Sequence, residues 1–224
     1  WVARHEVEKR LAAKGWRHGW LMGFRGITNA TNERSVIATV VPKAGAGNSM
    51  PLLVPKEQAD PRLYACLLAN LCALVFDYVA RQKVGGTNLN FYIFEQFPIL
   101  PPERYGAAEL DYIVPRVLEL TYTAEDLAPW ASDLGYHGAP FAFDPERRAV
   151  LRAELDALYA RLYGLSREEL CYILDPAAVM GDDDPSETFR VLKEKEMKTH
   201  GEYRTRRLVL EAWDRLPHSE QNPC

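Results

Sequence analysis

The most informative part of the sequence is Arg81-Gln-Lys-Val-Gly-Gly-Thr-Asn-Leu-Asn-Phe-Tyr-Ile-Phe-Glu-Gln-Phe-Pro-Ile-Leu-Pro-Pro102. It follows a long apolar segment, residues 63–79, which predicts one buried helix. The glycine pair at 85–86 is expected to end that helix, because glycine readily adopts the conformations found at helix ends. A polar loop then leads into a short aromatic segment, which we predict to be a strand ended by prolines.

The same stretch carries polar groups suited to binding phosphates. Arg81 and Lys83 stand at the end of the predicted helix, and Thr87, Asn88 and Asn90 form the loop after it. We expect these side chains at one exposed edge, where cations and free backbone N–H groups bind phosphates. If the loop only ends the helix, DNA would be contacted elsewhere, by residues 20–42.

Residues 20–42 are the second candidate segment. Two runs rich in β-branched and aromatic residues, 20–27 and 35–41, predict strands, and residues 52–54 predict a short third one. The connection between the first two strands is dense in small polar residues, which bond either their own backbone or a ligand. This segment contributes the candidates Arg25, Thr28, Asn29, Asn32 and Arg34.

Two interpretations of these candidates stay open. Arginine binds guanine through two hydrogen bonds or holds a phosphate, and asparagine binds adenine in the same bidentate way. Alternatively, Arg34 pairs with a carboxylate and the asparagines only shape the turn.

The chain after Pro102 has a different character. Residues 107–120 and 144–162 predict helices, the second with an aspartate N-cap, a proline in its first turn and a stripe of leucines. We therefore predict an α+β fold. A small mixed β-sheet with one long buried helix forms a recognition region, residues 1–104, and an all-helical part, residues 105–224, braces or docks it.

Charge is divided unevenly between these two parts. The net charge is −4, but residues 1–104 hold 13 Lys and Arg against 8 Asp and Glu, whereas residues 105–224 hold 14 against 23. A basic first part and an acidic second part suit contact with a nucleic acid on one side of the molecule.

Cysteine usage and hydropathy indicate a cytoplasmic protein that does not enter a membrane. The four cysteines show no Cys-x-x-Cys pair and no metal-ligand spacing, which favours a reducing compartment. Asn70 and Asp77 interrupt the apolar segment 63–80, so a buried helix is favoured over a membrane span. Since the sequence opens at Trp1 without a methionine, we expect it to be part of a longer protein.

Four motifs together resemble one family. They are the quoted stretch 81–102, the upstream segment Phe24-Arg-Gly-Ile-Thr-Asn-Ala-Thr-Asn-Glu-Arg-Ser-Val-Ile-Ala-Thr-Val-Val-Pro42, and the downstream segments 158–165 and 188–196. The chain resembles, from about residue 20 to residue 213, the C-terminal target-recognition region of adenine-N6 DNA methyltransferases and fused type II restriction-modification enzymes, which is related to the recognition domains of type I specificity subunits.

The resemblance implies sequence-specific recognition of double-stranded DNA. It also implies that S-adenosylmethionine binding and base flipping belong to a catalytic region upstream in the same chain, and the family includes members that are fused to an endonuclease. No cofactor is expected in the present sequence. The residues expected to contact DNA are Arg25, Thr28, Asn29, Asn32, Arg34, Arg81, Lys83, Thr87, Asn88 and Asn90.

Residues for catalysis are not found in the sequence. An adenine-N6 methyltransferase needs an Asn-Pro-Pro-Tyr-like loop to hold the flipped base, and Leu100-Pro-Pro-Glu103 lacks both its polar first residue and its aromatic last one. We predict neither catalytic residues nor metal ligands, and we interpret the three aspartates at 182–184 as a solvated loop. The alternative function is an assembly module, in which the acidic helical part docks a partner and DNA is not touched. A self-sufficient enzyme is a third possibility.

Overall fold

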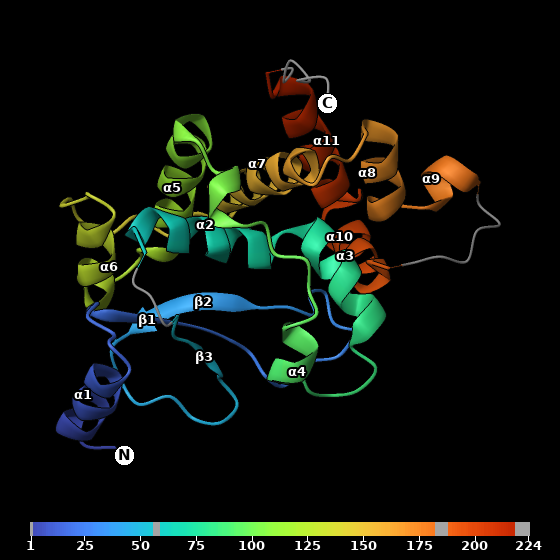
Figure 1. Cartoon of the computed structure of the whole chain (residues 1–224). Coiled ribbons are helices and arrows are strands. Elements are labelled where there is room, and N and C mark those ends of the chain that lie inside the picture. The colour runs from blue at the N-terminus through green and yellow to red at the C-terminus, as the bar shows by residue number, and fades with distance from the viewer. Residues whose placement is uncertain (1, 56–58, 182–187, 218–224) are drawn as a thin grey trace.

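A computed structural model describes residues 2–55, 59–181 and 188–217. The fold is α+β, as predicted, with a small sheet beneath a layer of helices (Figure 1). The strands are β1 (Trp20–Phe24), β2 (Ala38–Pro42) and β3 (Leu52–Leu53). The helices are α1 (Arg4–Ala13), α2 (Pro61–Cys72), α3 (Leu74–Lys83), α4 (Phe91–Phe94), α5 (Ala107–Thr121), α6 (Ala128–Asp133), α7 (Pro145–Leu162), α8 (Arg167–Leu174), α9 (Ala177–Met180), α10 (Arg190–His200) and α11 (Arg204–Arg215), with short 3-10 turns at Pro102–Arg104 and Glu125–Leu127.

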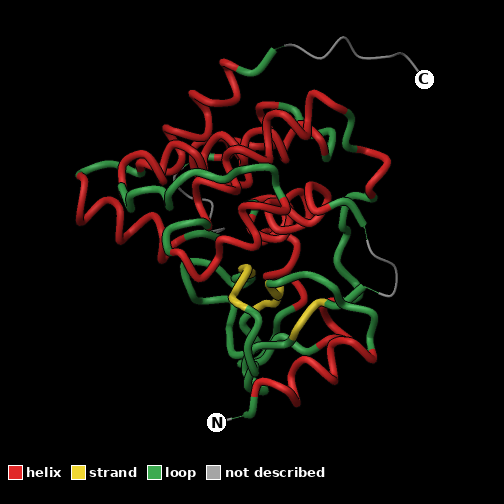
Figure 2. Tube along the Cα trace, turned by 90° about the vertical axis from the view of Figure 1, so that its left-hand side faces the viewer, coloured by secondary structure: helices red, strands yellow, loops and turns green. Residues whose placement is uncertain are grey.

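The sheet is antiparallel, and the prediction of a mixed sheet is wrong. Its strand order is β2-β1-β3, with Trp20 opposite Pro42 and Met22 opposite Leu53. The connection from β1 to β2 folds back to the neighbouring strand, whereas the connection from β2 to β3 passes β1 and places β3 on its other side, so both outer strands run antiparallel to β1. Gly23 allows β1 and β3 to approach closely, because a Cβ atom at this position would lie 2.6 Å from the carbonyl oxygen of Pro51. Figure 2 shows the strands between α1 and the main helical layer.

The predicted long buried helix is broken in two. Ala73 has an extended conformation, with φ −69° and ψ 143°, and α2 and α3 bend by 59° across it. The break has a distant cause: the backbone N–H of Leu74 donates a 2.6 Å hydrogen bond to the buried carboxylate of Asp156 in α7. Within the described residues, no single helix is long and apolar enough to cross a membrane.

The aromatic segment after residue 90 is the short helix α4, so the prediction of a strand there is wrong. The Phe94 ring stacks on Phe24 of β1 at a centroid distance of 4.5 Å, and Phe91 meets the same ring edge-on. The carbonyl of Asn90 accepts hydrogen bonds from Ile93 and Phe94 at 3.0 Å. Packing on β1 therefore overrides the β-propensity of these residues.

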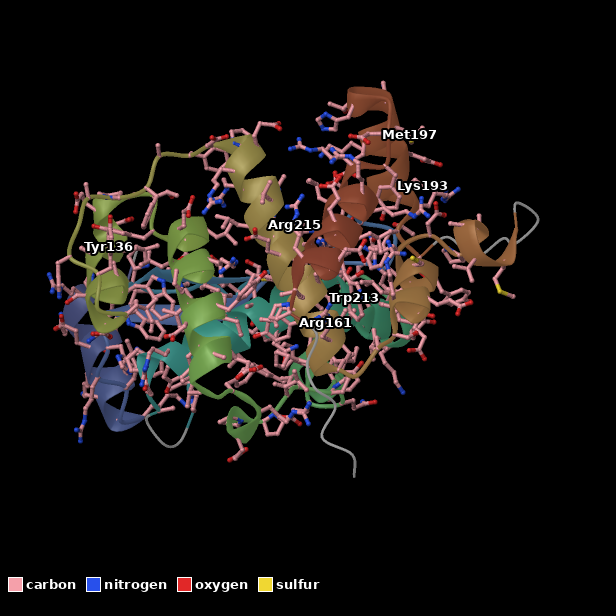
Figure 3. All side chains as sticks on the ribbon, turned by 90° about the horizontal axis from the view of Figure 1, so that it is seen from above. Tyr136, Arg161, Lys193, Met197, Trp213 and Arg215 are labelled. Carbon is pink, nitrogen blue, oxygen red and sulfur yellow. The ribbon has the colours of Figure 1, made fainter. Side chains whose placement is uncertain are left out.

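The helical part shares one hydrophobic core with the first part of the chain. Helix α2 packs against α5, and α7 packs against α11 and α3. Seen from above, Arg161 of α7 reaches Trp213 of α11 (Figure 3), where it lies over the indole ring and donates a 2.7 Å hydrogen bond to the Trp213 carbonyl. The boundary between two regions at residue 104 stays a prediction.

Tyr159 connects this core to α2 and supplies a test of it. Its fully buried hydroxyl donates a 2.6 Å hydrogen bond to the carbonyl of Cys66. Burial raises the pKa of the Tyr159 phenol well above its ordinary value, and it also raises the pKa of the Cys66 thiol to about 12. Both groups are held neutral by the fold.

We expect the free energy of unfolding to fall as the pH rises above the pKa values of the unfolded chain, about 8.5 for cysteine and 10 for tyrosine. A group whose pKa is higher in the folded state than in the unfolded chain contributes its full stabilisation at pH values below the unfolded-state pKa. This contribution is lost as the pH rises toward the folded-state pKa. Tyr159→Phe should cost about 1 kcal/mol at neutral pH. It should also flatten the alkaline decline by up to about 1.4 kcal/mol per pH unit. Urea denaturation across pH measures both, with the exposed Tyr92→Phe as control; an unchanged alkaline slope in Tyr159→Phe would contradict the assignment.

Candidate nucleic-acid interface

The two segments predicted to contact DNA lie side by side. Thr28 N–H donates a 2.9 Å hydrogen bond to the carbonyl of Thr87, and Leu89 N–H donates one of 2.7 Å to the carbonyl of Gly26. Ile27 and Asn88 thereby form an isolated antiparallel bridge. We call residues 25–28 and 87–90 the paired edge. It lies where the loop after β1 meets the loop before α4 (Figure 1).

Half of the predicted residues face outward at or near this edge. Arg25, Thr87, Asn88 and Asn90 are exposed, and so is Lys83 at the end of α3. The Arg25 backbone is held by a 2.8 Å bond from its N–H to Ile37, and its Nε donates a 2.5 Å bond to the carbonyl of Ile27. The remaining guanidinium N–H groups of Arg25 have no hydrogen bond to the described residues, so they are free to bind a ligand.

Three predicted residues shape the turn after β1 instead. Thr28 is buried and its hydroxyl donates a 2.6 Å hydrogen bond to the carbonyl of Ser35. The side-chain oxygen of Asn29 accepts bonds from the backbone N–H and the hydroxyl of Thr31, and the Asn32 amide donates to the Thr28 hydroxyl at 3.4 Å. These contacts match the alternative in which the asparagines form the turn.

Arg81 is buried, and the expectation that it lies at an exposed edge is wrong. Its Nε donates a 2.9 Å bond to Asp77, and the guanidinium lies over the Phe189 ring. The other four N–H groups donate to the carbonyls of Ala30 (2.8 Å), Thr188 (2.8 Å), Asn32 (2.7 Å) and Glu33 (2.7 Å). All five donors of the guanidinium are therefore used, and none is left for DNA. The sequence signal for this role is the i, i+4 spacing of Asp77 and Arg81.

Arg34 also points inward, in agreement with the carboxylate-pairing alternative. Its Nη2 lies 3.4 Å from a carboxylate oxygen of Asp156, and 24% of its side chain is exposed. Burial lowers the pKa of Arg34, but the charges of Asp156 and Asp77 outweigh this and raise it. Burial raises the pKa of Asp156 in spite of the nearby guanidinium. Arg34 thus joins the first part of the chain to α7.

The sequence did not predict two features of this surface, which are a group of exposed apolar side chains and a hollow. Ile27 is 58% exposed, Phe91 of α4 is exposed and lines the same hollow, and Tyr92 of α4 is exposed as well. A hollow of about 800 Å³ is lined by the paired edge and the loop before β3, and its polar lining includes Asn48, Ser49, Asn88 and Asn90. In its sequence the loop at 42–51 looks like a plain connection. It reaches this surface only through pairing with β1, which the sequence does not indicate.

The charges on the surface bear on both candidate functions, DNA binding and assembly with a protein partner. Several cations of the first part have no carboxylate within 4 Å among the described residues: Lys9, Arg10, Lys14, Arg17, Arg25, Lys43 and Lys83. Many acidic residues of the helical part are paired within the part of the chain that the structure describes, as in Glu146–Arg204 (2.6 Å), Glu119–Arg147 (2.9 Å) and Asp214–Arg167 (2.8 Å). The cations in these pairs belong to the same part of the chain, so its excess of acidic over basic residues remains.

A metal site is not found among residues 2–55, 59–181 and 188–217, where no group of three or more His, Cys, Asp or Glu side chains is arranged to hold an ion. The three aspartates at 182–184 lie outside the described residues. No protein-family model, curated protein or solved structure matches this chain.

Proposed function

We propose that this chain recognises a DNA sequence for a restriction-modification adenine-N6 DNA methyltransferase and binds double-stranded DNA through the paired edge. The observation that carries the proposal is the hydrogen-bonded pairing of residues 26–28 with residues 87–89, two segments whose residue types each suggested DNA contact. Their pairing supports one continuous surface on which cations and amides stand together.

The outward residues divide naturally into two roles. Arg25 and Lys83 supply positive charge for the phosphate backbone, which gives affinity but no sequence preference. Asn88 and Asn90 carry amides able to donate to and accept from one adenine edge, and Ile27 offers an apolar contact for a thymine methyl group. Base contacts of this kind give specificity.

The buried residues of the same segments position this surface. Thr28 and Arg81 bond backbone carbonyls of the loop after β1, and Arg34 ties this loop to Asp156 of α7; none of the three is assigned a DNA contact. The proposal leaves S-adenosylmethionine and the methyl transfer to a catalytic region outside this sequence, so no residue here is given a role in either. The free thiols Cys66, Cys72 and Cys171 fit a reducing cytoplasm, where such enzymes meet their DNA.

Fluorescence anisotropy with a labelled random-sequence duplex tests the phosphate role. Affinity should fall linearly on a log–log plot against salt concentration, and the slope of Arg25→Ala/Lys83→Ala should be smaller by about one for each phosphate-binding cation that is removed. Lys198→Ala, an exposed cation of α10, is the matched control and should keep the wild-type slope. Absence of binding by the wild-type chain at low salt would contradict the proposal.

A second arm tests the base-reading role separately. Selection from a random duplex pool should enrich one motif with the wild-type chain. The variant Asn88→Ala/Asn90→Ala should bind random duplex with an unchanged salt slope but no longer select the motif, because phosphate contacts remain while base contacts are removed. A motif that persists in this variant would place sequence reading elsewhere. Binding to neither pool, together with a defined protein partner, would favour the assembly function.

A further inference from the structure

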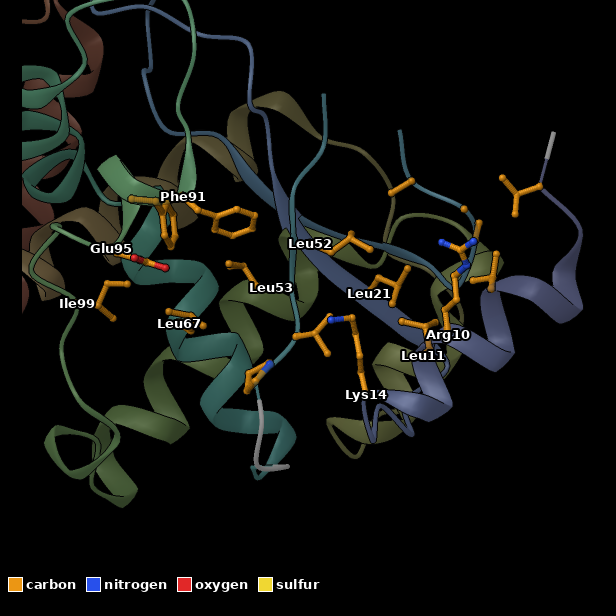
Figure 4. A pocket seen from close by; sticks show the side chains of 18 residues that line it. Arg10, Leu11, Lys14, Leu21, Leu52, Leu53, Leu67, Phe91, Glu95 and Ile99 are labelled. Atoms are coloured by element: carbon orange, nitrogen blue, oxygen red, sulfur yellow. The ribbon is translucent and has the colours of Figure 1, made fainter. Parts of the chain in front are cut away.

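A second surface lies on the other side of β3 from the centre of the sheet. A groove of about 780 Å³ runs between α1, β3, α2 and α4 (Figure 4). Its lining is largely aliphatic and aromatic, and includes Leu21, Leu52, Leu53, Leu67, Phe94 and Ile99. Ile99 and Phe91, which also lines it, are exposed. An open apolar groove of this size is typical of a binding surface.

The groove follows a free strand edge. Strand β3 is the last in the sheet order and pairs only with β1. Because Phe24 N–H donates to the carbonyl of Pro51 at 3.1 Å, the alternation of an antiparallel ladder also directs the backbone groups of Leu53 toward β1. The N–H and C=O groups of Leu52 and Val54 therefore point away from β1.

The side chains of β3 lead to the same conclusion. Successive residues of a strand point to opposite faces of the sheet. Leu52, Leu53 and Val54 nevertheless all line this one groove. A groove reaches both faces of a strand only where it runs along the strand's edge, so unpaired backbone groups and apolar side chains are presented together.

One wall of the groove is positively charged. Arg10 and Lys14, four residues apart in and just after α1, reach from that helix toward the groove (Figure 4). Neither has a carboxylate within 4 Å among the described residues. Glu95 stands at the opposite end, beside Phe91 and Ile99. A ligand that complements this arrangement is apolar along its length and acidic where it faces α1.

We propose that this groove binds an extended segment of a separate protein, which adds a strand to β3 and places acidic side chains against Arg10 and Lys14. A nucleic-acid backbone fits poorly, because its phosphates would be desolvated on an apolar floor. An extended peptide satisfies the outward N–H and C=O groups of Leu52 and Val54 through main-chain bonds, and its alternate side chains fill the apolar lining. This inference stands independently of DNA binding.

A random-peptide display library, selected on the whole chain, tests the proposal. Enriched peptides should alternate apolar residues with Asp or Glu. Binding of the most enriched peptide, measured by anisotropy, should weaken about tenfold or more in Arg10→Glu/Lys14→Glu at low salt. The matching peptide with lysine at its acidic positions should prefer this variant over the wild-type chain. Lys198→Glu is the control and should bind like the wild type.

Backbone pairing is tested with N-methylated versions of the same peptide. One peptide is methylated at every odd amide and another at every even amide. Only one of the two should lose binding, because only every second N–H of an added strand faces β3. No enrichment, enrichment of basic peptides, or equal binding of the two methylated peptides would overturn the proposal. Self-association of the chain that Arg10→Glu/Lys14→Glu abolishes would do the same, since the occupant would then be a second copy.

Discussion

Replacing Asp77 by alanine is expected to lower the free energy of unfolding by about 3–5 kcal/mol. The Asp77 side chain is 1% exposed, and its two oxygens accept bonds from the Arg81 Nε at 2.9 Å and from the backbone N–H groups of Ser35 and Val36 at 2.8 and 2.7 Å. The substitution leaves one charge and two N–H groups buried without their acceptor. Urea denaturation followed by circular dichroism measures the loss.

Two further variants separate charge from hydrogen bonding at this site. Asp77→Asn keeps an acceptor for Ser35 and Val36 but removes the charge opposite Arg81. Its free energy of unfolding should therefore lie between those of the wild type and Asp77→Ala. Asp111→Ala, at an exposed position of α5, is the control and should change stability by less than about 0.5 kcal/mol. A cost below about 1 kcal/mol for Asp77→Ala would show that the Arg81 network does not hold the fold.

The second large effect is expected at Asp156, with a loss of about 2–4 kcal/mol in Asp156→Ala. One oxygen accepts the Leu74 N–H at the start of α3, where Ala73 offers no side-chain cap. The other faces Arg34. Without the carboxylate, the first N–H of α3 loses its acceptor and the mostly buried guanidinium of Arg34 loses its counter-ion. The junction between α2 and α3 should therefore loosen as well.

Hydrogen exchange locates this effect. The Leu74 amide should exchange faster in Asp156→Ala than the global loss of stability explains, because its own acceptor is gone. Glu168→Ala, at an exposed position of α8 without an ion pair among the described residues, is the control and should cost less than about 1 kcal/mol. Equal costs at the two positions would indicate that Asp156 does not cap α3.

Features with local signals were predictable from the sequence. Asp144 caps α7 by accepting from the N–H of Glu146 at 2.9 Å, as its place before a proline indicates. Residue types within a few positions also predict the strands. They likewise predict the end of α3 at Lys83, just before the glycine pair. The division of the fold into a small sheet and helices rests on such short-range patterns.

Long-range contacts account for what was missed. Nothing near Ala73 in the sequence breaks a helix, because the acceptor that holds Leu74 comes from α7, 82 residues later. The aromatic segment at 91–94 favours a strand until Phe94 stacks on Phe24. Likewise, the residue types at 25–34 and 81–90 suggest polar contacts, but whether Arg81 faces solvent or Asp77 depends on packing against Phe189 at the start of α10. The direction in which a side chain points is set by tertiary packing.

The way Arg81 holds the loop after β1 has a consequence for how such a protein changes over time. Within this loop the guanidinium donates only to the main-chain carbonyls of Ala30, Asn32 and Glu33, and every amino acid has such a carbonyl. The anchoring is thus indifferent to the side chains that the loop displays. Single substitutions at positions 25 and 27, where the side chains face solvent, should therefore change the exposed surface without moving the backbone of the loop.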